Sequence, residues 1–195
     1  QLPGSTFSQC VKLSKLTLQE GIQFIDGSAI SGTEASPLMG LTELVIPSTV
    51  KEILNSAFAY NASLHSITFA EGSQLETMGT FVFQGCTALE SIVLPGSLKN
   101  INTTGSSYRY NGDEMTIMVS GMFGKCTALK HVDMSACEKL LEIPSYVFNN
   151  CPNMETLLLP PNLKTVQVSA CGLQFKKDGS SVIGAGKIKE LVIPA

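Results

Sequence analysis

The stretch Leu89-Glu90-Ser91-Ile92-Val93-Leu94-Pro95 contains a motif that recurs along the 195-residue chain. Ile92 and Leu94 are apolar and are separated by one residue, which is the alternation expected of a short β-strand with one buried side. Pro95 ends the strand, because proline has no amide hydrogen to donate to a sheet. The motif starts at seven places, which are Leu13, Leu41, Leu64, Leu89, Leu129, Met154 and Ile188.

Two further positions recur at a fixed distance from the next strand motif in four of the repeats. A phenylalanine stands six residues before the next start, and asparagine or cysteine stands three residues before it. We expect these residues to form a structural ladder inside the molecule, made of Phe58, Phe83, Phe123, Phe148, Asn61, Cys86, Cys126 and Cys151. A unit this short cannot bury its own apolar side, so successive repeats must stack.

The spacing of the repeats predicts the type of stack. Successive starts are 28, 23, 25, 40, 25 and 34 residues apart, and the shorter spacings fall in the leucine-rich repeat range of about 20–29 residues. We therefore predict that residues 1–195 form a single α/β solenoid, a right-handed superhelix. It has one parallel sheet of about seven short strands, short helical or 3-10 turns on the other face, and hairpin-like insertions in the long repeats.

The repeat also resembles a known family. The combination Leu-x-x-Ile-x-Leu-Pro, then x-x-Leu-Lys-x-Ile, then Ala/Val-Phe-x-x-Cys-x-x-Leu is similar to the BspA-like, Treponema-type leucine-rich repeat of bacterial surface proteins. The resemblance runs from about Leu13 to Pro194 and is sharpest between Leu41 and Leu163. It implies an extracellular or cell-surface location and a role in adhesion to host proteins.

Composition excludes two classes of partner. The chain has 44% hydrophobic and only 15% charged residues, and its net charge is −3. No basic field is present to hold a nucleic acid or an anionic membrane surface. No apolar run approaches the roughly 20 residues that a membrane span needs, so we expect no direct membrane insertion. The first residues contain no recognisable signal peptide, and we expect further sequence after Ala195 in the natural protein.

The six cysteines divide into two groups. Cys86, Cys126 and Cys151 share a position that Asn61 fills in another repeat, and this interchange favours buried free thiols over disulfides. Cys10, Cys137 and Cys171 lie outside that position, so they are the stronger candidates for pairing or reactivity.

We find no pattern that indicates catalysis or cofactor binding. The only histidines are His65 and His131, and neither a Cys-x-x-Cys nor a His-x-x-x-His pair is present to bind a metal. There is no Gly-x-Ser-x-Gly elbow, and the glycine-rich stretch 179–187 lacks the order of a phosphate loop. We predict no enzymatic activity, no metal and no cofactor.

Binding residues are expected in two places. One is the outward side of the sheet, where Val45, Val93, Asp133 and Leu158 share a column; ordinary strand filler is the alternative interpretation of the apolar ones. The other is the 40-residue repeat, in which Tyr108, Arg109 and Tyr110 precede an Asn111-Gly112 turn signal and a return strand over 115–119. Tyrosine and arginine are enriched at contact hot spots, although a passive surface excursion is equally consistent with this segment.

These observations lead to two functional hypotheses. The first is a non-catalytic, exported recognition module that adheres to a host protein or glycan through the sheet and the insertions. The second is a purely structural spacer domain of a larger surface protein. The sequence identifies neither the ligand nor the anchor.

Overall fold

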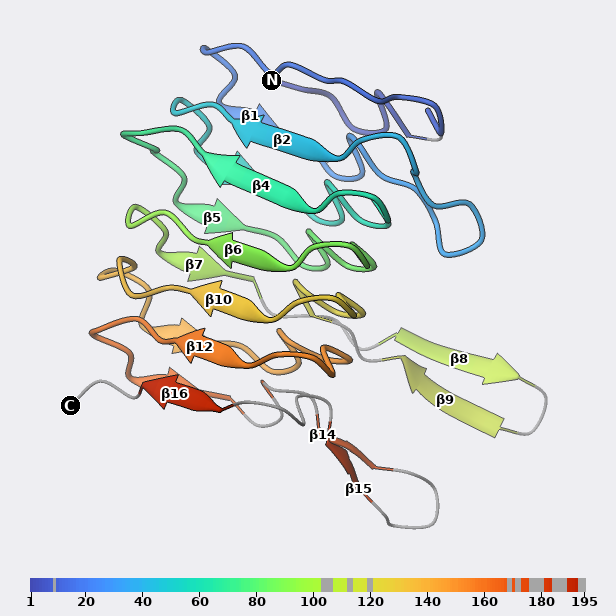
Figure 1. The fold of residues 1–195 in the computed structure, drawn as a ribbon, viewed down its shortest axis with the longest axis vertical. Coiled ribbons are helices and arrows are strands. Elements are labelled where there is room, and N and C mark those ends of the chain that lie inside the picture. Colours follow the sequence, from blue (N-terminus) through green and yellow to red (C-terminus); the bar gives the residue numbers. More distant parts are fainter. Residues whose placement is uncertain are drawn as a thin grey trace.

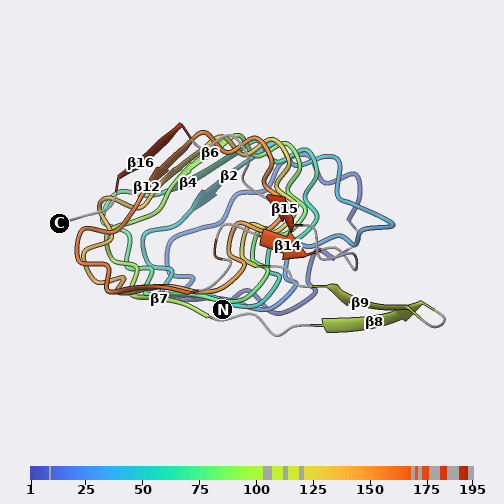
Figure 2. The ribbon, with the colours of Figure 1, turned by 90° about the horizontal axis from the view of Figure 1, so that it is seen from below.

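The protein is a β-solenoid whose coils stack along one axis (Figure 1). This computed structural model describes residues 1–8, 10–102, 107–111, 114–118, 121–167, 170, 173–175, 181–183 and 189–192. Seen along the stack, each coil has two sides made of strands and a third side made of turns (Figure 2). We call these sides the front ladder, the back ladder and the turn side.

The front ladder contains the parallel strands that the repeated motif predicts, but they form a two-stranded and a four-stranded sheet instead of one. Its strands begin two residues after six of the seven repeat starts. They are β2 (Glu43–Ile46), β4 (Ser66–Phe69), β6 (Ser91–Val93), β10 (His131–Asp133), β12 (Thr156–Leu158) and β16 (Glu190–Val192). Pairing is in register, since Leu44 lies opposite Ile67 and Ile92 opposite Val132. These inward side chains are at most 4% exposed, which explains why the motif requires an apolar residue there.

The first repeat differs from this prediction. No strand forms over residues 13–18, although Leu16 and Leu18 pack against the core. Side-chain hydrogen bonds connect this coil to the next one, because the Glu20 carboxylate accepts from the backbone amides of Ser48 and Thr49. The bond from Ser48 is the main reason that the pKa of Glu20 lies below its usual value.

The back ladder is a second set of parallel strands, built from the second apolar step of the repeats. Its strands have two residues each: β1 (Phe24–Ile25), β3 (Glu52–Ile53), β5 (Thr77–Met78), β7 (Asn100–Ile101), β11 (Glu142–Ile143) and β13 (Thr165–Val166). β1, β3, β5 and β7 are continuous, and β11 pairs with β13. The ladder divides between β7 and β11, where the long repeat leaves the stack.

The turn side corrects the prediction of helical or 3-10 turns, because the described residues contain no helix. Left-handed backbone stands two residues after each stacked phenylalanine, at Tyr60, Gly85, Lys125 and Asn150, with φ between 58° and 72°. A helix needs consecutive right-handed residues, so these positions interrupt it. Backbone amides on this side therefore donate to carbonyls of the next coil and not to carbonyls within a helix. Phe58 donates to the Val82 carbonyl at 3.0 Å, and Phe83 to that of Met122 at 2.9 Å.

The core lies between the three sides and contains a continuous column of aromatic rings. Phe58, Phe83, Phe123 and Phe148 are fully buried. Successive ring centroids are 5.8, 5.4 and 5.5 Å apart, and the planes differ by at most 16°. Aromatic packing therefore acts together with the backbone hydrogen bonds to hold successive coils in register.

Both long repeats contain the predicted hairpins. β8 (Ser107–Asn111) pairs antiparallel with β9 (Glu114–Met118). β14 (Leu173–Phe175) pairs antiparallel with β15 (Ser181–Ile183). Asn111 lies opposite Glu114, so the two linking residues are Gly112 and Asp113 rather than Asn111 and Gly112. Neither linking residue lies within the described part of the chain.

Candidate binding surface

The outward side of the front ladder carries the column that the sequence predicts. Val45 is 57% exposed and Val93 is 63% exposed. Val93, Asp133 and Leu158 lie in neighbouring positions, because strand register pairs Val93 with Asp133 and Asp133 with Leu158. Val45 belongs to the separate pair of β2 with β4, where it lies opposite Thr68. The column is therefore a three-strand patch with Val45 standing apart from it.

The Asp133 side chain in this patch stabilises the turn that follows its own strand. Its Oδ1 accepts hydrogen bonds from the backbone amide of Ser135 at 2.8 Å and from the Ser135 hydroxyl at 2.6 Å. These bonds hold the turn that follows β10 and reduce the capacity of the carboxylate for a ligand. The two valines and Leu158 supply the apolar part of the surface.

The hairpin that carries Tyr108, Arg109 and Tyr110 does not extend this patch. These residues lie on β8, which leaves the stack after β7 of the back ladder. Figure 2 shows β8 and β9 projecting on the opposite side of the cross-section from β6 and β12. The two predicted binding regions therefore face different directions, and one compact ligand cannot contact both at once.

The shared asparagine and cysteine position is a ladder of side-chain hydrogen bonds to backbone carbonyls. Asn61 donates through Nδ2 to the Ile30 carbonyl at 2.6 Å. Cys86 donates to the Phe58 carbonyl at 3.3 Å, and Cys126 donates to that of Phe83 at 3.1 Å. Each bond joins one coil to the coil before it, which is why a small polar donor is required there. Asn61 leaves its buried Oδ1 without a partner in the described structure, whereas a thiol leaves no such group.

Cys137 corrects the sequence-based expectation of a reactive or paired thiol. It is free and buried, and its sulfur donates to the Pro95 carbonyl at 3.4 Å. Burial raises the pKa of Cys137 to about 12, with a smaller contribution from the Asp133 carboxylate. Burial likewise raises the pKa of Cys86 to about 12. Cys10 is free and exposed, and Cys171 lies outside the described residues.

We predict that thiol reagents separate these two environments. At pH 8, Cys10 should be alkylated at least about 100-fold faster than Cys86, Cys126 or Cys137 in the native protein, because only the thiolate reacts and burial suppresses it. Timed alkylation followed by peptide mass mapping measures each rate, with guanidinium-denatured protein as the control in which all sites react. Native labelling of Cys126 at the rate of Cys10 would contradict the buried ladder.

Candidate catalytic and metal-binding groups are not brought together. His65 and His131 are both exposed and lie on different coils. Among the described residues, no group of three histidines, cysteines or carboxylates is close enough to hold a metal ion. In the same residues, no helix is long and apolar enough to cross a membrane.

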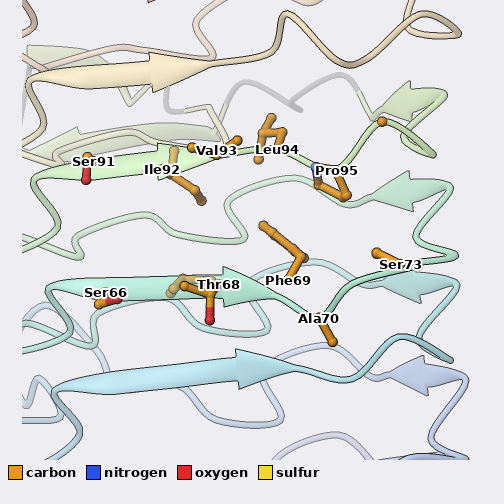
Figure 3. A pocket seen from close by; sticks show the side chains of 13 residues that line it. Ser66, Thr68, Phe69, Ala70, Ser73, Ser91, Ile92, Val93, Leu94 and Pro95 are labelled. Carbon is orange, nitrogen blue, oxygen red and sulfur yellow. The ribbon is translucent and has the colours of Figure 1, made fainter.

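Sequence reasoning missed an open pocket of about 560 Å³ on the front ladder. It is lined by β4 and β6, which belong to separate sheets, and by the turns that follow them. Figure 3 shows the Phe69 side chain standing in this pocket, near Leu94 and Pro95 of the next coil. The available signal was Phe69, because this position is Leu, Ile or Met in every other copy of the motif.

The repeat pattern agrees with a known family. The model of the BspA type leucine rich repeat region matches residues 1–111 and 106–174, with six copies. The chain belongs to the BspA-type leucine-rich repeat family. No curated protein matches this BspA-type chain.

Solved structures of bacterial leucine-rich repeat proteins are similar to it. A leucine-rich repeat protein from Bacteroides ovatus is 20% identical with a TM-score of 0.64, over 84% of this chain and 36% of that one. The pneumococcal vaccine antigen PcpA is 26% identical with a TM-score of 0.56, over 85% of this chain and 43% of that one. This BspA-type chain thus spans less than half the length of either protein.

Proposed function

We propose that the chain is a non-catalytic recognition module at the surface of a bacterial cell or outside it, which adheres to a host protein or glycan. The observation that carries the proposal is the exposed patch on a rigid sheet, with Val93 63% exposed and with Asp133 and Leu158 in register beside it. Contiguous apolar patches on a protein surface mark sites of contact with other molecules. The similarity to PcpA, described as a vaccine antigen, supports an exposed location.

Binding measurements with matched variants test this function. The full chain is screened by biolayer interferometry against host extracellular-matrix proteins and by glycan array. Val93→Thr/Leu158→Thr should weaken binding at least about tenfold, because it removes apolar contact area from the patch. Val166→Thr is the control, because Val166 is 53% exposed on the back ladder and should leave affinity unchanged.

A second pair of substitutions addresses the insertion. Tyr108→Ala/Arg109→Ala should leave affinity unchanged for a ligand of the front patch, since β8 projects to the other side of the stack. Loss of binding in this variant alone would move the site to the hairpin. Absence of binding to every protein and glycan tested would favour the structural spacer.

A further inference from the structure

An ion pair on the turn side joins two coils that are not neighbours in the stack. Lys125 Nζ lies 2.7 Å from Glu34 Oε1. When coils are counted from the repeat starts, Glu34 belongs to the first coil and Lys125 to the fourth. Lys130 and Glu90 also form an ion pair, but they belong to neighbouring coils. Because each repeat of a solenoid ordinarily contacts only its neighbours, the pair of Glu34 with Lys125 is a connection of a different kind.

The loop that carries Glu34 is a compact, preformed turn. The amides of Gly32 and Leu38, at its two ends, each donate to a carbonyl of the second coil at 2.9 Å. Between them, Thr33 and Ser36 exchange backbone hydrogen bonds of 3.1 and 3.2 Å. A side chain at position 32 would come within 2.8 Å of the Leu38 nitrogen and the Ser36 carbonyl, so glycine is needed where the ends approach. Figure 1 shows the loop, in light blue, descending from the first coil along the turn side.

Lys125 stands at a backbone position that does not favour lysine. Its φ is 63°, in the left-handed region, and the same position in the preceding coil is Gly85 with φ 72°. A side chain is sterically disfavoured at such angles, so glycine would suit the backbone better. The ion pair gives the lysine a role that glycine could not fill. The Lys125 side chain is 28% exposed, and a partly buried pair is screened less by salt than a fully exposed one.

The first coil has less backbone pairing than the coils that follow. No strand forms over residues 13–18, so the parallel pairing of the front ladder is missing there. The coil is joined on the back ladder, where Phe24 pairs with Glu52. On the turn side, the Ile30 amide donates to the Ala57 carbonyl at 2.9 Å. Segments with few backbone hydrogen bonds open locally more readily than the rest of a protein.

We propose that residues 32–38 form an ionic strap, which keeps the first coil closed on the stack and loosens as the ionic strength rises. Opening the first coil on the turn side would separate Glu34 from Lys125, so the ion pair opposes it. Salt weakens that opposition, because the screening length falls from about 10 Å at 0.1 M to about 3 Å at 1 M. Loosening uncovers Ile30 and Leu38, which are 0% and 2% exposed in the closed coil. This device goes beyond the proposed recognition function and does not depend on it.

Hydrogen exchange followed by NMR tests the strap in the full chain. The Ile30 amide reports on the first coil, and the Phe123 amide, which donates to the fifth coil at 2.9 Å, is the internal reference. Glu34→Gln keeps the size of the side chain and removes its charge. We expect exchange at Ile30, relative to Phe123, to rise about threefold in this variant, which is the scale of a partly exposed ion pair. High salt should raise the same ratio in the wild type but not in Glu34→Gln.

Three further variants separate the strap from general destabilisation. Lys125→Gly removes the ion pair and suits the left-handed backbone, so Ile30 should exchange faster although the urea midpoint does not fall. Lys125→Arg keeps the charge and should exchange as the wild type does. Lys130→Gln is the matched control, because it breaks an ion pair of similar length, 3.0 Å, between neighbouring coils and should leave Ile30 unchanged. Unchanged exchange at Ile30 in both Glu34→Gln and Lys125→Gly, or an equal response to salt in the wild type and Glu34→Gln, would overturn the proposal.

Discussion

Raising the pH from 8 to 10 is expected to lower the free energy of unfolding by about 4 kcal/mol through the buried thiols of Cys86 and Cys137, and the Cys126 thiol should lower it further. Burial raises the pKa of Cys86 and Cys137 to about 12 and that of Cys126 well above its usual value. In the unfolded chain a thiol titrates near pH 8.5. Cys86 and Cys137 therefore each favour the native state less by about 2 kcal/mol at pH 10 than at pH 8, given about 1.4 kcal/mol per pH unit.

The sign follows from proton counts. Between about pH 8.5 and 12, the unfolded thiols have lost their protons while the native ones retain them, so the unfolded state binds fewer protons and stability falls as pH rises. Below about pH 8 both states are protonated and these groups contribute no pH dependence. A loss of this size is comparable with the total stability of an ordinary domain, about 5–15 kcal/mol.

Urea unfolding from pH 7 to 10.5, with a reductant present, measures this effect. Cys86→Ala should reduce the slope of stability against pH by about one proton above pH 9, because one buried thiol has been removed. Cys10→Ala is the control: its thiol is exposed, so the profile should match that of the wild type. Parallel profiles for Cys86→Ala and the wild type would show that the buried thiols do not set the alkaline limit.

The sequence was sufficient to predict features that depend on a strict period. Leu44 and Ile46 are buried on either side of exposed Val45, and the recurrence of this pattern placed six of the seven predicted front strands correctly, whereas no strand forms at the first start. The back ladder was not recognised as strands, because two-residue strands such as Glu52–Ile53 are too short to show a period. The helical turns failed for a different reason: left-handed φ values at Tyr60 and Lys125 occur at residue types that carry no such signal.

The candidate sites depend on packing between coils, which a repeat pattern does not contain. Cys137 lies outside the recurring cysteine position, yet its sulfur reaches a carbonyl of the preceding coil and is buried there. The open pocket beside Phe69 is likewise a property of two adjacent coils. Its residues look like an ordinary repeat when the motif is considered alone, and only the replacement of an aliphatic residue by phenylalanine distinguishes it.

Phe83→Ala is expected to destabilise the protein by about 3–5 kcal/mol, which is the usual cost of truncating a buried phenylalanine. Phe83 is fully buried, and it is stacked on both sides, at 5.8 Å from Phe58 and 5.4 Å from Phe123. Removing the ring leaves a cavity and deprives two neighbours of a partner, and each aromatic pair contributes about 0.5–1.5 kcal/mol beyond its burial.

The position of Phe83 within the stack adds a second consequence. In a solenoid each repeat contacts only its neighbours, so a cavity between two coils weakens the coupling of the parts on either side. We expect Phe83→Ala to lower both the urea midpoint and the steepness of unfolding, because the coils before and after position 83 then unfold less cooperatively. Phe24→Ala is the control, since Phe24 is 36% exposed and lies outside the aromatic column; it should cost less than Phe83→Ala and leave the steepness of unfolding unchanged. Equal stability of the two variants would show that the aromatic column does not couple neighbouring coils. Backbone hydrogen bonds alone would then hold the coils in register.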